Sequence, residues 1–262
     1  MRKGLTFHGN NQYETELFKK LSDAAGKYRI SDLFRDFLRY SACYISNISE
    51  SVHGAERGSQ IKELLQKYEG HFDLHECLEL LVKAIQQNME VGILRDILGR
   101  IFECIDLSNS ATGQFFTPEH ICRLMVKMTM DEEKLNDSGP ITVTEPCIGS
   151  GRMLLAFANE VQDKGYNYCD KMVALAVDID STCVFMSYIQ LSLYGVPAVV
   201  VHGNSLMVEE WSRWYTPAYI LRGRVFTHPM SIAEKMPEDD RKLQIMQIED
   251  MATLLSEIEK VS

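Results

Sequence analysis

Apolar residues recur three or four positions apart over most of residues 13–106, which is the spacing of one helix face. Capping residues and apolar stripes predict helices that begin near Ser31 and near Asp73, and a third helix over residues 91–105. The polar stretch 46–59 between the first two predicts a loop. The N-terminal part of the chain is therefore expected to be a helical region.

The pattern changes after residue 110. Three short apolar runs, at residues 141–144, 172–177 and 198–201, predict buried strands. Residues 152–161 and 181–194, which lie between these runs, have the spacing of helices. Strands that alternate with helices at these intervals form βαβ units and a parallel sheet. The second half of the chain therefore predicts an α/β fold.

The alternation fades beyond Ser205, where residues 219–226 are a candidate for one further strand. An acidic segment with a ragged apolar stripe follows and predicts a terminal helix, which would pack on its own domain or against a partner. The chain thus divides into a helical N-terminal region (1–110), an α/β domain (111–230) and an acidic C-terminal helix (231–262).

Composition narrows the class of protein. The 262 residues are 45% hydrophobic, which excludes intrinsic disorder and collagen, and no apolar run reaches the ~18 residues that span a membrane. The net charge of −10 disfavours a protein that binds a DNA duplex alone, so we expect DNA contact to need another subunit. Scattered cysteines without a C-x-x-C pair, and no apolar signal segment, predict reduced thiols in the cytoplasm.

The segment E-P-C-I-G-S-G-R, residues 145–152, joins the first predicted strand to a helix. Its two glycines let the backbone approach a ligand closely, and the helix start offers free N–H groups to a negative group. A mononucleotide phosphate loop needs a lysine after the second glycine, and none is present. A dinucleotide loop needs a third glycine where Leu154 stands, which disfavours a nucleotide-linked oxidoreductase. A tight turn without a ligand is the other alternative.

Polar residues also follow the next two predicted strands. Asp178 ends the second strand and Asn204 ends the third. A carboxylate at such a position can accept two hydrogen bonds from a ribose, and an amide can meet an adenine edge. Because the carboxyl ends of parallel strands share one edge, these groups are expected to lie near the glycine loop. Helix capping or turn formation is the alternative for both residues.

The stretch G-Q-F-F-T-P, residues 113–118, precedes the glycine loop by about thirty residues. This pair of motifs resembles the modification subunits of type I restriction systems and the wider γ-class adenine DNA methyltransferases, over roughly residues 70–206. The resemblance implies a Rossmann-like α/β sheet that binds S-adenosylmethionine, preceded by helices. Members of the family have more strands after the catalytic motif than this sequence predicts, so the sheet is expected to be short and could be incomplete. Matched by motif, the cofactor-binding residues are Gln114, Phe115, Thr117, Pro118, Glu145, Gly149, Gly151, Asp178 and Asn204. Thr117 and Pro118 are also typical of a helix start, with Thr117 as the cap.

The catalytic motif of that family, [ND]-P-P-[FYW], is missing, because the sequence contains no P-P pair. Thr216 or His228 would have to bond the target amine, with a nearby aromatic ring stacking on the base, and neither setting fits the motif. The catalytic residues are therefore unassigned. His71 and His75 lack a third ligand at useful spacing, so no metal site is predicted.

Two functions are expected, one from the resemblance and one from the missing catalytic motif. The first is methyl transfer from S-adenosylmethionine to the exocyclic amine of adenine in DNA, with DNA reached through partner subunits of the specificity type. The second is a catalytically impaired, S-adenosylmethionine-binding regulatory module that acts with partner subunits. A homodimer is compatible with the terminal helix, and no membrane contact is expected.

Overall fold

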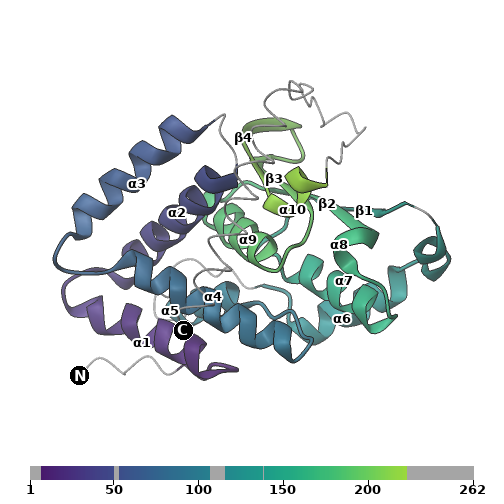
Figure 1. Cartoon of the computed structure of the whole chain (residues 1–262), viewed down its shortest axis with the longest axis horizontal. Coiled ribbons are helices and arrows are strands. Elements are labelled where there is room, and N and C mark those ends of the chain that lie inside the picture. Colours follow the sequence, from purple (N-terminus) through teal and green to yellow (C-terminus); the bar gives the residue numbers. More distant parts are fainter. Residues whose placement is uncertain (1–6, 50–52, 107–115, 138, 223–262) are drawn as a thin grey trace.

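The computed structural model describes residues 7–49, 53–106, 116–137 and 139–222 (Figure 1). The helices are α1 (Gln12–Asp23), α2 (Ile30–Ser49), α3 (Gly54–Tyr68), α4 (Leu74–Glu90), α5 (Ile97–Asp106), α6 (Glu119–Thr129), α7 (Arg152–Asp163), α8 (Tyr168–Lys171), α9 (Ser181–Leu193) and α10 (Pro217–Leu221). The strands are β1 (Ile141–Glu145), β2 (Met172–Asp178), β3 (Ala198–Asn204) and β4 (Glu209–Tyr215). The predicted terminal helix at 231–262 lies outside the described residues.

The N-terminal region is helical, as its periodicity predicts. The expected start of α4 is confirmed, because Asp73 caps the helix by accepting hydrogen bonds from the amides of His75 and Glu76. The loop predicted over 46–59 is wrong: α2 continues to Ser49 and α3 begins at Gly54. Arg57 explains part of the difference, because its guanidinium is buried and stacks 4.1 Å from the ring of Trp214 in β4.

The third predicted helix is shorter than expected. Its first six positions, 91–96, are not helical, and α5 begins at Ile97. Asn159 of α7 binds this non-helical stretch, since its side chain accepts from the Leu94 amide at 2.9 Å and donates to the Leu94 carbonyl at 2.8 Å. A side chain from a distant helix therefore replaces the bonds that a helical turn would have made.

The sheet has the order β1-β2-β3-β4, with β1, β2 and β3 parallel and β4 antiparallel to β3. Helices α7 and α9 connect the parallel strands, so the predicted α/β fold is confirmed as a Rossmann-like βαβαβ unit (Figure 1). Strand β4 was not predicted, because the sequence E-E-W-S-R-W-Y lacks a clean alternation and its first half is exposed. The strand predicted at 219–226 is wrong for its first three residues, because residues 219–221 lie in α10. Residues 223–226 lie outside the described residues.

The two faces of the sheet are packed differently. Small residues, Ala174, Ala176 and Ala198, point to the face covered by the helices and join the main hydrophobic core. The opposite face carries Val173, Leu175, Val177, Val199 and Val201, on which Tyr219 of α10 packs. Alanine on the helix side lets the helices lie close to the strands, which positions the turns at the carboxyl ends of β1 and β2.

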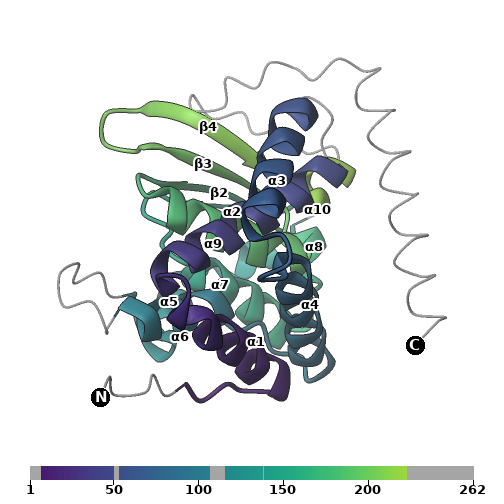
Figure 2. The same ribbon diagram turned by 90° about the vertical axis from the view of Figure 1, so that its left-hand side faces the viewer.

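One core connects the helical region to the α/β part. Buried residues of α1, α2, α4 and α5 belong to the same cluster as those of α7 and α9, and Figure 2 shows α2 lying across α9. The division at residue 110 stays a prediction. Among the described residues, no helix has both the length and the apolar character needed to cross a membrane.

Candidate functional site

The glycine loop lies between the end of β1 and the start of α7. Gly149 and Gly151 have φ angles of 56° and 93°, a left-handed conformation that glycine adopts without steric strain. The Ile148 amide donates to the Val177 carbonyl at 2.9 Å, and the Gly149 amide donates to the Asp178 carboxylate at 2.9 Å. The loop is therefore held against the carboxyl end of β2, as the sequence predicted for this edge.

Gly149 and Gly151 lie close to different parts of the structure. A Cβ on Gly151 would lie 3.3 Å from the backbone and side chain of Ser187, so this glycine lets α9 pack close to the loop. A Cβ on Gly149 would lie 3.0 Å from the ring of Phe116. Phe116 belongs to the G-Q-F-F-T-P stretch, so the structure brings the two sequence motifs into contact. Gln114 and Phe115 lie outside the described residues.

The sequence did not single out Phe116. The signal that could have found it is its place inside the G-Q-F-F-T-P stretch, directly beside Phe115. Its ring lies 5.5 Å from that of Phe102 in α5, which makes it a bridge between the helical region and the glycine loop. The structure therefore places Phe116 at the glycine loop.

Thr117 does not cap α6, contrary to the prediction. The N-cap position is Pro118, which makes no side-chain cap, and the Pro118 carbonyl accepts from the amides of Ile121 and Cys122. The Thr117 carbonyl instead accepts from the Arg152 guanidinium at 3.0 Å, and its side chain is exposed. The contact with a residue 35 positions away explains why the local capping pattern misled.

Two carboxylates lie beside the loop. Asp178 accepts from the amides of Gly149 and Asp180, one bond to each oxygen. Glu145 accepts from the Cys147 amide at 3.2 Å. Burial raises the pKa of the Glu145 carboxyl and the nearby charge of Asp178 adds to this, while the Cys147 amide opposes it. Both side chains remain partly exposed, so their free lone pairs can meet a ligand from solvent.

Asn204 forms a turn, as the alternative reading of its position anticipated. Its side-chain oxygen accepts from the amides of Leu206 and Met207, both at 3.1 Å. Its amide nitrogen makes no hydrogen bond within the described part of the chain. Exposed apolar side chains follow both β2 and β3: Ile179 is 61% exposed and Leu206 is 92% exposed. The edge formed by the carboxyl ends of β1, β2 and β3 is called the rim below. It carries the carboxylates of Glu145 and Asp178 and the amide of Asn204, together with exposed apolar side chains.

Thr216, one of the two candidates for bonding a target amine, is fully buried. Its hydroxyl donates to the Val196 carbonyl and accepts from the Ala198 amide, each at 2.9 Å. It holds the end of β4 to β3 and is closed to a substrate, so that candidate role is wrong. His228, the other candidate, lies outside the described residues.

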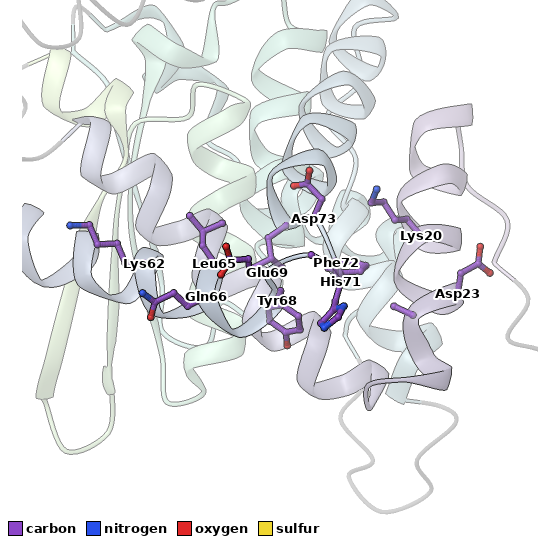
Figure 3. Close-up of a pocket in the computed structure, with 13 residues that line it drawn as sticks. Lys20, Asp23, Lys62, Leu65, Gln66, Tyr68, Glu69, His71, Phe72 and Asp73 are labelled. Carbon is purple, nitrogen blue, oxygen red and sulfur yellow. The ribbon is translucent and has the colours of Figure 1, made fainter.

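Two further features of the described structure are not part of this rim. A hollow of about 1020 Å³ lies between α1, α3 and the turn before α4 (Figure 3). Its polar groups hold the helices, since Lys20 pairs with Glu76 and Asp73 caps α4. Among the residues described, no three histidine, cysteine or acidic side chains gather as metal ligands would.

Comparison with known proteins gives three results. A profile described as N-6 DNA Methylase matches residues 94–253. A structure from Listeria monocytogenes, described as a class I S-adenosylmethionine-dependent methyltransferase, is 15% identical with a TM-score of 0.38, and the alignment covers 74% of this chain and 54% of that one. A type I restriction-modification methyltransferase subunit from Streptococcus thermophilus is 15% identical with a TM-score of 0.34, covering 70% and 57%. The chain thus spans a little over half the length of these structures, and no curated protein matches.

Proposed function

The chain belongs to the N-6 DNA methylase family, and from this premise we propose that it acts in methyl transfer from S-adenosylmethionine to the exocyclic N6 amine of adenine in DNA, as a modification subunit of the type I restriction kind. The observation that carries the proposal is the contact between the two motifs. Phe116 of the G-Q-F-F-T-P stretch lies on Gly149, whose amide is bonded to Asp178.

The residues at this rim suit an adenosyl group. The Asp178 carboxylate is oriented by two backbone amides and keeps acceptor capacity for the hydroxyls of a ribose. The free amide nitrogen of Asn204 and the exposed side chain of Ile179 suit the edge and face of an adenine ring. Gly149 and Glu145 would border the amino-acid part of the donor. When bound, S-adenosylmethionine supplies an electrophilic methyl group on a sulfonium.

The chain lacks a recognised group for the target amine. The sequence contains no P-P pair, and Thr216 is buried in hydrogen bonds. Transfer requires the amine lone pair to be aimed at the methyl carbon, and positioning of this kind can account for several kcal/mol of the barrier. We therefore propose that the isolated chain binds the methyl donor and transfers the methyl group slowly or not at all. The same observation favours the second candidate function, a donor-binding regulatory module.

Target DNA is proposed to be reached through a partner subunit. The net charge of −10 gives the chain a surplus of acidic groups, whereas duplex binding draws its affinity from lysine and arginine contacts to phosphates. A specificity-type subunit would supply those contacts and the choice of sequence.

Transfer of labelled methyl groups tests the proposal. Purified chain would be incubated with labelled S-adenosylmethionine and unmethylated DNA, with and without candidate partner subunits from the same genome. We expect label in DNA adenine when a partner is present and little without one. Donor binding without transfer in any combination would support the regulatory module instead. Binding of NAD but not S-adenosylmethionine in calorimetry would contradict both functions.

A further inference from the structure

Arg152, the first residue of α7, is buried in a polar cluster that the functions above do not use. Its guanidinium Nε donates to the Asp96 carboxylate at 2.7 Å. The same oxygen of Asp96 accepts from the Ser150 hydroxyl at 2.6 Å, and the other oxygen accepts from Gln190 of α9 at 3.0 Å. Asp96 is 3% exposed and Arg152 is 8% exposed. One end of Arg152 is therefore tied to the glycine loop, to the start of α5 and to α9.

The other end of Arg152 reaches the Phe116–Pro118 segment, residues 116–118. One guanidinium nitrogen donates to the Thr117 carbonyl at 3.0 Å. Both terminal nitrogens also lie within 3.4 Å of the Glu103 carboxylate. Glu103 in turn accepts from the Phe116 amide at 3.3 Å. Consecutive backbone groups of the segment are thus held by a single arginine and its carboxylate partner.

Two glycines, Gly99 and Gly149, let the neighbouring elements lie close to the glycine loop. A Cβ on Gly99 would lie 2.2 Å from Asp96 and 2.5 Å from Ser150, so α5 can sit on the loop only with glycine at this position. A Cβ on Gly149 would lie 3.0 Å from Phe116. The loop and the Phe116–Pro118 segment are therefore in contact at the same place where Arg152 joins their backbones.

The Arg152 guanidinium keeps its positive charge in this cluster. Burial lowers the pKa of the Arg152 guanidinium, but the adjacent carboxylates of Asp96 and Glu103 outweigh burial and raise it above its ordinary value. Arginine stays charged under all physiological conditions, and its planar fork can bond two carboxylates and a carbonyl together. A lysine or glutamine could satisfy only part of this set.

We propose that Arg152 is a positioning residue that holds the Phe116–Pro118 segment against the glycine loop, and thereby shapes the side of the methyl-donor site that this segment forms. The part about the donor rests on the proposed function. The part about the segment concerns this chain alone and can be tested without any ligand.

Cys122 provides a reporter for the segment. Its thiol is fully buried and lies 3.5 Å from the Thr117 carbonyl, the acceptor that Arg152 also bonds. If the segment leaves the loop, this thiol gains access to solvent and reacts with an alkylating reagent. Cys43, Cys77 and Cys183 are also fully buried but belong to other parts of the core, so they report general unfolding.

The experiment compares thiol alkylation rates, resolved by peptide mass spectrometry, in the parent chain, Arg152→Gln and Arg123→Gln. Arg123 is the matched control, since it lies on the neighbouring helix α6 and forms a partly exposed ion pair with Glu119 one turn away, its one ion pair within the described part of the chain. We expect Cys122 to react about tenfold faster in Arg152→Gln, because charge-assisted hydrogen bonds to the segment are lost. The other three buried thiols and the Arg123→Gln chain should react as the parent does. Unchanged protection of Cys122 in a folded Arg152→Gln chain would overturn the proposal.

A second variant decides the case in which Arg152→Gln does not fold. Glu103→Gln leaves the Asp96 contacts of Arg152 in place and weakens only the side that reaches Phe116. Faster alkylation of Cys122 alone in this variant would support the proposal, and full protection would refute it.

Donor binding separates this inference from the proposed function. We expect Arg152→Gln to bind S-adenosylmethionine about tenfold more weakly, mainly through faster release, since a loosely held segment encloses the donor less well. If the parent chain binds no donor, the proposed function fails while the alkylation result still decides the role of Arg152. Parental donor affinity in a variant with exposed Cys122 would refute the link to the donor site.

Discussion

The backbone amide of Gly149 donates a hydrogen bond to the carboxylate of Asp178 across 2.9 Å, which joins the turn after β1 to the end of β2. The second carboxylate oxygen of Asp178 accepts from the Asp180 amide at 2.9 Å. Two backbone donors therefore fix the orientation of this carboxylate before any ligand arrives. A ligand at the rim pays little side-chain entropy to use it, which is the advantage of a preorganised acceptor.

Replacing Asp178 tests its assignment to the ribose. We expect Asp178→Ala to bind S-adenosylmethionine at least about tenfold more weakly, because hydrogen bonds to a charged group contribute roughly 1.5–3 kcal/mol each. Isothermal titration calorimetry measures the change. Asp170→Ala is the control, since Asp170 lies on α8 and pairs with Arg222 at the surface. Parental affinity in Asp178→Ala would remove the ribose assignment.

Gly149 is expected to tolerate no side chain. Gly149→Ala combines a φ of 56° with a Cβ 3.0 Å from the Phe116 ring. Both effects act on the folded state, so we expect the free energy of unfolding to fall by about 1–3 kcal/mol. Urea denaturation followed by circular dichroism measures it. Gly139→Ala is matched, because a Cβ there would meet nothing within 4 Å, and its stability should stay near that of the parent.

Glu145 gives stability a pH dependence. Because burial and then the Asp178 charge hold the pKa of its carboxyl above the ordinary 4.5, the folded protein binds this proton more tightly than the unfolded chain does. The stabilising contribution is fully present below pH 4.5 and is lost as pH rises through the folded-state pKa. We therefore expect Glu145→Gln to melt at a higher temperature than the parent near pH 7.

The difference in melting temperature between Glu145→Gln and the parent should shrink as the pH is lowered toward 4.5. Differential scanning fluorimetry across that interval measures it. Glu16→Gln, on the exposed face of α1, serves as the comparison. A Glu145→Gln chain that is less stable than the parent at pH 7 would show that the carboxylate is favoured at this position.

Replacing Thr216 tests whether its buried hydroxyl stabilises the fold. Thr216→Val removes a fully buried hydroxyl that bonds both Val196 and Ala198. We expect the free energy of unfolding to fall by about 1–3 kcal/mol, because the partners left behind are buried without a hydrogen bond. Thr216→Ser, which keeps the hydroxyl, should retain most of the stability in urea denaturation. Unchanged stability of the Thr216→Val chain would contradict this structural role of the hydroxyl.

Local features of the sequence were enough for several parts of the fold. The apolar runs of β2 and β3, the helical spacing of α7 and α9, and the cap at Asp73 each depend on neighbours a few residues away. Because parallel strands end at a common edge, the closeness of Asp178 to the glycine loop also followed from the pattern. These predictions are confirmed, since each needs only periodicity, capping or strand direction.

The tertiary structure decided the features that depend on distant partners. The stretch before α5 is not helical because the Asn159 side chain bonds both backbone groups of Leu94. Thr117 does not cap α6, and its carbonyl accepts from Arg152. No local pattern contains these bonds, because their partners are 65 and 35 positions apart in the chain. Burial makes them decisive: a polar group removed from water must find a partner, and the fold alone determines which one lies within reach.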